Sequence, residues 1–307
     1  MDMHRVFCGS ADSYSDAALL TSLWGTLLPS GTGKEEQCYV CFIAKGEVGD
    51  TPLELEIGDT TSRLIILLEE AATATLHVHL DPQKADALHF TEIFIRTGAT
   101  LHLLFFQNSA SSSLTVKQRS SLDSDARLHV QNISLGSGTL THTLLSDING
   151  ARSESTVDWL FYSRNTEKQR IDARNAFHAR EGRGEITMKG VAEGEAHSVC
   201  TGMIDIDPGG GGTDTYLTED VLMLDKTAKV DAIPGLEIKT NDVKASHSAT
   251  VSKVTSEDLF YFAARGIATK EAREMYVLGF LGDLTQRILD VAKREVVMGE
   301  IERKYRN

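Results

Sequence analysis

Short runs of alternating apolar and polar residues follow one another from residue 37 to residue 254, with almost no helical periodicity. Alternation of this kind predicts half-buried β-strands, because successive side chains on a strand point to opposite faces of its sheet. The runs start roughly 10 to 18 residues apart, which is a soft internal repeat. The predicted strands begin near Cys38, Leu53, Arg63, Thr75, Leu88, Thr100, Ser113, Arg127, Thr139, Ser155, Arg170, Glu185, His197 and Thr215.

Turn-forming residues separate these predicted strands, for example Asp81-Pro82 and Asn149-Gly150. The spacing fits a sandwich, a large barrel or a β-helix, and periodicity by itself does not separate the three. Only 7% of the residues are aromatic, and no helix interrupts the strands. A long series of short strands is easier to build as a solenoid, in which each turn stacks on its neighbours. The sequence therefore favours a mainly β protein with a β-helix core over residues 37–254.

The character of the sequence changes to helical after Val254. Thr255 is a predicted N-cap with Asp258 three residues later, and Arg265-Gly266 is predicted to end this first helix. Thr269 is predicted to cap a second helix. An apolar stripe then follows at intervals of three and four residues, formed by Val277, Leu281, Leu284, Ile288 and Val291.

Three segments are therefore predicted. Residues 1–36 form a short N-terminal segment, in which Ala17 to Leu28 are expected to form a short helix. Residues 37–254 form the β-helix core, and residues 255–307 form a small α-helical domain. The last residues, from Arg294 to Arg306, are heavily charged.

Charge and composition exclude several classes of partner. The 307 residues include 44 acidic and 31 basic ones, which gives a formal net charge of −13. Nucleic acids require a basic face, so no nucleic-acid partner is expected. No apolar run is long enough to cross a membrane, and no apolar stretch of a signal peptide follows the first residues. The sequence predicts a soluble, cytoplasmic protein without a membrane partner.

The four cysteines are too few and too unevenly spread for a disulfide framework, so reduced thiols are expected. Cys38 and Cys41 have the CxxC spacing of a redox pair or of half a zinc site. They lie in a predicted strand, however, where positions three apart point to opposite faces. A structural role is therefore favoured for both, and Cys200 is expected in the core.

Two glycine-containing segments resemble phosphate-binding loops only in part. Gly31-Thr32-Gly33-Lys34 lacks the earlier Gly of a P-loop and has Glu35 where Ser or Thr is needed. The run Gly209 to Gly212 is followed by neither Lys nor a helix, so a turn between strands is predicted.

Histidines provide the remaining candidates for metal binding. His77 and His79 lie two residues apart on a predicted strand, so both rings are on one face and could share a metal with His102 from a neighbouring strand. A solvated pair on a polar face is the alternative. Neither a Gly-x-Ser-x-Gly nor a His-Glu-x-x-His motif is present, and no pair of acidic residues can be assigned as general acid and base.

The segment from Asp231 to Ile267 resembles the C-terminal signature of the SufB/SufD family of iron–sulfur cluster assembly proteins. It contains Pro-Gly-Leu-Glu-Ile at 234–238, Ser-His-Ser-Ala-Thr at 246–250, Leu-Phe-Tyr at 259–261 and Arg-Gly-Ile at 265–267. The second stretch is closer to the SufD version. Gly202 and Asp214 also occupy familiar places.

The resemblance implies a right-handed parallel β-helix followed by a helical domain. It also implies that the helical tail docks a SufC-like ABC-type ATPase, while the last strands pair with a SufB-like subunit or a second copy of this chain. The residues that match the docking segment are Leu259, Phe260, Tyr261, Arg265, Gly266 and Ile267. The assembled complex would build a transient iron–sulfur cluster and pass it to other proteins.

One residue matches a candidate ligand of the family. His247 corresponds to the interface histidine that SufD-like proteins offer to iron or to the cluster, and an imidazole is a reasonable iron ligand. Ala245 stands where many SufD proteins have Cys, and Leu217 to Leu222 contain no thiol where SufB has its scaffold cysteine. The chain alone is therefore expected to hold no stable cluster.

The leading hypothesis is a SufD-like scaffold subunit that is not an enzyme. One alternative is a β-helix carbohydrate-active enzyme, although such enzymes are usually secreted and rich in aromatic platforms. The other is a non-catalytic structural homodimer formed through the same terminal strands.

Overall fold

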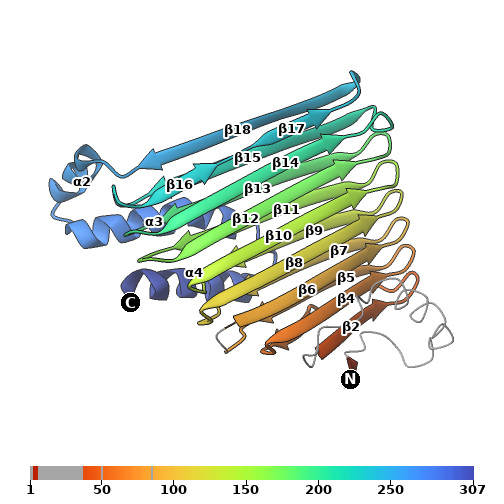
Figure 1. The fold of residues 1–307 in the computed structure, drawn as a ribbon, viewed down its shortest axis with the longest axis horizontal. Coiled ribbons are helices and arrows are strands. Elements are labelled where there is room, and N and C mark those ends of the chain that lie inside the picture. The colour runs from red at the N-terminus through yellow and green to blue at the C-terminus, as the bar shows by residue number, and fades with distance from the viewer. Residues whose placement is uncertain (1–2, 6–36, 50, 84–85) are drawn as a thin grey trace.

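Figure 1 shows the computed structural model of the chain, which describes residues 3–5, 37–49, 51–83 and 86–307. Two parallel sheets face each other along the molecule, and three helices follow at the C-terminal end. The predicted N-terminal helix at Ala17 to Leu28, the P-loop-like residues 31–34 and Cys8 lie outside the described residues.

From β2 to β16 the strands alternate between the two sheets, so each turn contributes one strand to each, and β17 then joins the same sheet as β16. The first sheet contains β1 (Met3–Arg5), β2 (Gln37–Ile43), β4 (Thr61–Leu68), β6 (Asp86–Ile95), β8 (Ser113–Leu122), β10 (Thr139–Ile148), β12 (Lys168–Phe177), β14 (His197–Ile206), β16 (Lys229–Ala232) and β17 (Gly235–Ile238). The second contains β3 (Leu53–Ile57), β5 (Thr73–Leu80), β7 (Thr100–Gln107), β9 (Arg127–Ser134), β11 (Glu154–Ser163), β13 (Arg183–Ala192), β15 (Thr213–Met223) and β18 (Val243–Lys253).

All strand pairs are parallel and in continuous register, as between Thr139 of β10 and Lys168 of β12. The predicted parallel β-solenoid is therefore confirmed. Each of the fourteen predicted strand starts falls within two residues of an observed one, because turn residues and alternation mark strand ends strongly.

The main core fills the space between the two sheets. Its largest side chains include Phe105, Trp159 and Phe161, all with no exposed surface. Cys41 belongs to this core, whereas Cys38 packs with Val40 in a separate small cluster. The two sulfurs thus lie on opposite faces of β2, as the strand assignment predicted.

Three helices follow the last strand, namely α2 (Ser256–Ala263), α3 (Thr269–Thr285) and α4 (Val291–Arg306). Thr255 caps α2 as predicted, and its side chain and that of Asp258 form a capping box. Gly266 adopts a positive φ of 78° just beyond the helix, a conformation that glycine takes without strain.

Two predictions for the helical segment were wrong. Ala268, not Thr269, is the N-cap of α3, and it provides no side-chain cap. The cause is the turn after α2, which leaves Ala268 as the last extended residue and makes Thr269 the first helical one. Val291 does not continue the apolar stripe, because α3 ends at Thr285 and Val291 begins α4 on an exposed face. Helix α4 itself was not predicted, since charged residues dominate its sequence.

Both longer helices cover the outer face of the second sheet (Figure 1). Val277 and Leu281 of α3 pack with Ile301 of α4 against outward apolar side chains of the sheet, such as Leu160 and Tyr162. This second apolar cluster joins the helices to the solenoid, a contact worth about 25 cal/mol for each Å² of apolar surface removed from water. None of the described helices has the length and apolar character needed to span a bilayer.

Candidate functional site

Strand β18 forms the last edge of the second sheet and pairs with β15 on one side only. It is eleven residues long and half-buried or exposed throughout. An edge strand of this length presents a row of backbone N–H and C=O groups that another strand can bind. The C-terminal end of the solenoid is therefore a ready site for a partner chain.

His247 lies near the middle of this edge strand. In the register it stands beside Leu217 of β15, a residue of the main core, so its side chain is on the inward-facing side of β18. Unlike Leu217 it is exposed, because no further turn covers the end of the solenoid. Its neighbours on the same face are Ala245 and Ala249, both small.

A fully buried carboxylate lies one position along the same face. Glu219 of β15 stands beside Ala249 in the register and reaches across the interior to the first sheet, where Oε1 accepts a hydrogen bond from the backbone N–H of Gly202 at 2.5 Å. A Cβ at position 202 would lie 2.4 Å from Cδ1 of Leu217 and 3.0 Å from this carboxylate oxygen. Glycine is thus needed for the close approach.

Burial sets the proton affinity of Glu219 and of the nearby Cys200 thiol. Burial raises the pKa of Glu219 to about 7, although backbone donors from Gly202 and Ile233 act in the opposite direction. The Cys200 thiol lies 4.0 Å from the Glu219 carboxylate, and burial raises its pKa as well. Cys200 lies in the main core, as predicted, and its raised pKa makes it a thiol of low reactivity.

Helix α2 is the second exposed feature at this end of the molecule. It has no buried residue, and the side chains of Phe260 and Tyr261 are 73% and 55% exposed. Arg265 lies over the Tyr261 ring at 3.6 Å, and Phe262 packs against Tyr276 of α3. Exposed aromatic side chains beside an arginine are typical of surfaces that bind proteins.

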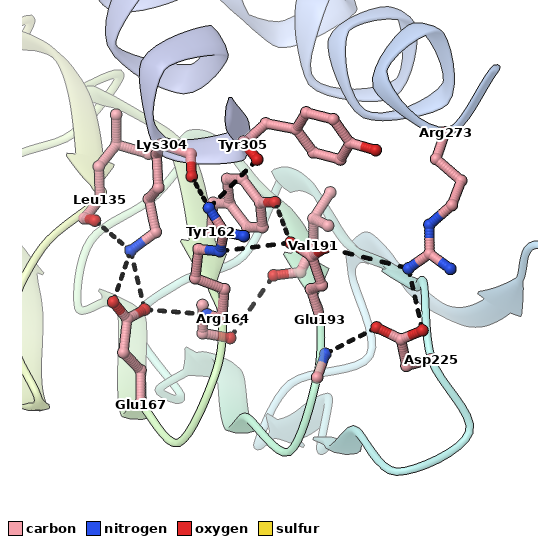
Figure 2. Close-up of polar contacts among 12 residues, drawn as sticks. Leu135, Tyr162, Arg164, Glu167, Val191, Glu193, Asp225, Arg273, Lys304 and Tyr305 are labelled. Atoms are coloured by element: carbon pink, nitrogen blue, oxygen red, sulfur yellow. Dashed lines mark hydrogen bonds and ion pairs between the residues drawn. The ribbon is translucent and has the colours of Figure 1, made fainter. Parts of the chain in front are cut away.

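Helix α4 is fixed to the turns of the solenoid by a network of charged groups (Figure 2). The Lys304 ammonium donates to Glu167 at 2.8 and 2.9 Å and to the backbone carbonyl of Leu135. Arg164 donates to the last carbonyls of the helix, those of Lys304 and Tyr305. A cation at this position also satisfies the helix C-terminus electrostatically.

The network continues to the N-terminal part of α3. Arg273 pairs with Asp225 at 2.9 Å, and Asp225 also accepts the backbone N–H of Gly194 at 2.8 Å. Tyr162 donates to Glu193 at 2.5 Å, and Arg164 lies 3.5 Å from the same carboxylate. Four successive turns of the solenoid, those that follow β9, β11, β13 and β15, therefore hold the two long helices (Figure 2).

The histidines proposed as metal ligands are not brought together. His77 and His79 bond Glu54 and Glu56 of the neighbouring strand at 2.9 and 2.6 Å. His102 stands beside Thr75 and His129 in the register and not beside either of them. Among the side chains that the structure describes, no group of three or more His, Cys, Asp or Glu is arranged to hold a metal ion.

The structure also shows the role of the glycine run and of two residues that the sequence analysis did not identify. The run Gly209 to Gly212 forms the turn between β14 and β15, as predicted. Glu219 was not singled out from the sequence, although a lone carboxylate at an inward position of an alternating strand was a usable signal. The buried cation Lys304 was likewise missed, because it lies in a charged segment without apparent periodicity.

These features define a class of parallel β-solenoid with an open edge strand and an exposed helix at its C-terminal end. Residues 55–280 match the family described as "SUF system FeS cluster assembly, SufBD core domain". The chain belongs to this family, and the resemblance noted from residues 231–267 is thereby confirmed.

Relatives extend the match along the chain. The iron–sulfur cluster assembly protein SufD of Escherichia coli is 28% identical over 292 residues, which cover 92% of this chain and 67% of that protein. An iron–sulfur cluster assembly SufBD family protein of Mycobacterium leprae is 26% identical over 244 residues, 78% of this chain but only 27% of that protein. A third relative, an iron–sulfur cluster assembly SufBD family protein of Mycobacterium bovis, is 26% identical over 310 residues, which cover 97% of this chain and 73% of that protein.

Proposed function

We propose that this chain is a SufD-like scaffold subunit of a cytoplasmic iron–sulfur cluster assembly complex, without catalytic activity of its own. It acts with a SufC-like ABC ATPase and with a SufB-like subunit or a second copy of itself. The observation that carries the proposal is the half-paired strand β18, which brings His247 to the open end of the solenoid in a chain of the SufBD core family.

Under this proposal the cluster is a cargo of the complex and not a resident group of the chain. Clusters are usually held by several thiolates. The described cysteines lie on β2 and β14, and all three are buried. We therefore expect a partner to provide thiolates, and His247 would add an imidazole ligand from this side of the interface.

Replacing His247 by alanine is expected to impair cluster formation in the complex reconstituted anaerobically with the candidate ATPase and SufB-like subunit. The side chain is exposed, so the isolated variant should lose less than about 1 kcal/mol of unfolding free energy. Absorption spectroscopy of the complex and urea unfolding of the isolated chain measure the two effects.

A matched control is His178→Ala, because His178 is also partly exposed but pairs with Asp207 on the outer face of the first sheet. This variant should assemble clusters normally. Normal cluster assembly by the His247 variant would remove the ligand role, whereas a large loss of stability would instead make His247 a structural residue.

The assigned docking surface consists of Leu259, Phe260, Tyr261, Arg265, Gly266 and Ile267. Phe260 is its most exposed aromatic side chain, and truncating a central aromatic residue of an interface commonly costs about 2 kcal/mol. Phe260→Ala should therefore weaken binding of the ATPase about 30-fold, as measured by calorimetry.

Val296→Ala provides the control for this experiment. Val296 is an exposed apolar residue too, at 51%, but it lies on α4 and outside the docking surface. Its replacement should leave the affinity unchanged. Equal effects of the two variants, or none from Phe260→Ala, would argue against α2 as the ATPase contact.

A further inference from the structure

The interior of the solenoid is not uniformly apolar. In its middle turns, strands β7 to β10 direct several polar side chains inward. Six of them have at least one unpartnered polar atom, and we call these six the interior polar cluster. Each of these side chains is at most 3% exposed. The members are Gln107, Gln118, Ser120, Asn132, His142 and Ser146.

The register brings these side chains together. Ser120 of β8 stands directly beside Ser146 of β10, and His142 lies on the same face of β10. From the opposite sheet, Asn132 donates through Nδ2 to Oε1 of Gln118 at 2.8 Å, so the cluster bridges the interior. Gln107 contributes one further hydrogen bond, which its Oε1 accepts from the Gly136 N–H at 3.3 Å.

Most polar atoms of the cluster still have no protein partner. The unpartnered buried atoms are Gln107 Nε2, Gln118 Nε2, Ser120 Oγ, Asn132 Oδ1, His142 Nδ1, His142 Nε2 and Ser146 Oγ. A buried polar atom without a hydrogen bond costs about 1–3 kcal/mol, and folded proteins leave very few of them. Seven such atoms on four neighbouring strands are the observation from which we infer a bound ligand.

The chemistry of the cluster defines that ligand. Its open positions include donors, such as the two amide Nε2 groups, and acceptors, such as Asn132 Oδ1. It contains no carboxylate, Lys or Arg, and an ion would need such a group to balance its charge in a buried site. An apolar ligand would leave every one of these atoms without a hydrogen bond. A small, uncharged molecule that both donates and accepts fits all of them.

We propose that the interior polar cluster binds ordered water molecules, which form a hydrated compartment inside the solenoid. Water bound in protein interiors typically makes about three hydrogen bonds to such buried groups. His142 is the central group, because its ring is fixed against Trp159 at 4.4 Å and Phe105 at 5.5 Å while both of its nitrogens remain available. The compartment is independent of the interface at β18.

A high-resolution crystal structure of the chain tests this directly. We expect ordered solvent within hydrogen-bonding distance of a His142 nitrogen and of Ser120 or Ser146. An interior without solvent, in which these atoms are paired with one another or packed against carbon, would overturn the proposal.

Water relaxation dispersion tests it in solution by counting long-lived internal water molecules. Ser120→Ala combined with Ser146→Ala should lower the count by at least one, because the variant removes two hydrogen-bonding groups without adding volume. Ser121→Ala is the matched control, since Ser121 is the next residue of β8 and its hydroxyl accepts from Asn149 on the outer face. An unchanged count in the double variant would contradict the proposal, and so would an equal decrease in the control.

Discussion

Replacing Lys304 by alanine is expected to lower the free energy of unfolding by about 3 kcal/mol, because one partner of a buried ion pair is removed. The Lys304 side chain is 11% exposed and that of Glu167 21%. Burial lowers the pKa of Lys304, and the Glu167 carboxylate opposes this shift. The variant leaves Glu167 and the Leu135 carbonyl without their shared donor, and it also loosens the end of α4.

Urea unfolding followed by tryptophan fluorescence measures this effect. Arg306→Ala is the control, because Arg306 lies on the same helix and pairs with Glu274 but is 57% exposed. Arg306→Ala should lower the free energy of unfolding by less than about 1 kcal/mol. The double variant Lys304→Ala, Glu167→Ala should lose less than the sum of the two single variants. A Lys304 variant as stable as the wild type would show that the helix is held by apolar contacts alone.

Acidification should destabilise the fold through two histidines buried in their neutral form. Burial lowers the pKa of His89 to about 3, with a smaller contribution from Arg63, and burial lowers the pKa of His142 well below its usual value. His89 is bonded on both sides, to Ser62 and Thr91, at 2.8 Å each. In the unfolded chain both histidines titrate near pH 6.5.

The sign of the effect follows from proton binding. Below about pH 6.5 the unfolded state binds one more proton at each of these histidines than the native state does. Their contribution to stability is therefore complete above that pH and decreases as the pH falls. On going from pH 7 to pH 5, each histidine should lower the free energy of unfolding by about 2 kcal/mol, or about 4 kcal/mol for the two together.

Glu219 acts in the opposite direction over the same range. Its pKa in the native state is raised to about 7, so between pH 7 and pH 5 the native state holds a proton that the unfolded state releases. This should offset about 2 kcal/mol of the loss. Unfolding free energies at the two pH values should therefore differ less in His142→Phe than in the wild type, and more in Glu219→Gln.

The control for the pH experiment is His178→Phe, which removes an exposed histidine on the outer face. Carboxylates elsewhere in the chain contribute equally to all these variants, so the comparison isolates the buried groups. If His142→Phe showed the same pH dependence as the wild type, His142 would have to bind a proton in the native state as readily as in the unfolded chain.

Local sequence determined the strands from β2 to β15, most of the turns and the first helix. Alternation placed fourteen strand starts, since the period of two on a strand is a local property of neighbouring residues. It also placed Cys38 and Cys41 on opposite faces. The capping box at Thr255 could be predicted for the same reason, because it depends only on residues three apart.

The tertiary structure decided which strands became neighbours, and alternation alone carries no information about that. Register separated His102 from His77 and put His247 above the core residue Leu217. It also placed Glu219 against Gly202, a contact between two sheets that no local pattern encodes. Helix α4 was not predicted, because it has few apolar residues. Val297 and Ile301 become buried only by packing against the outer face of the second sheet, which the local sequence does not reveal. Contacts between separate parts of the chain, from 17 positions apart for Gly202 and Glu219 to 140 for Arg164 and Lys304, supplied what the sequence alone could not.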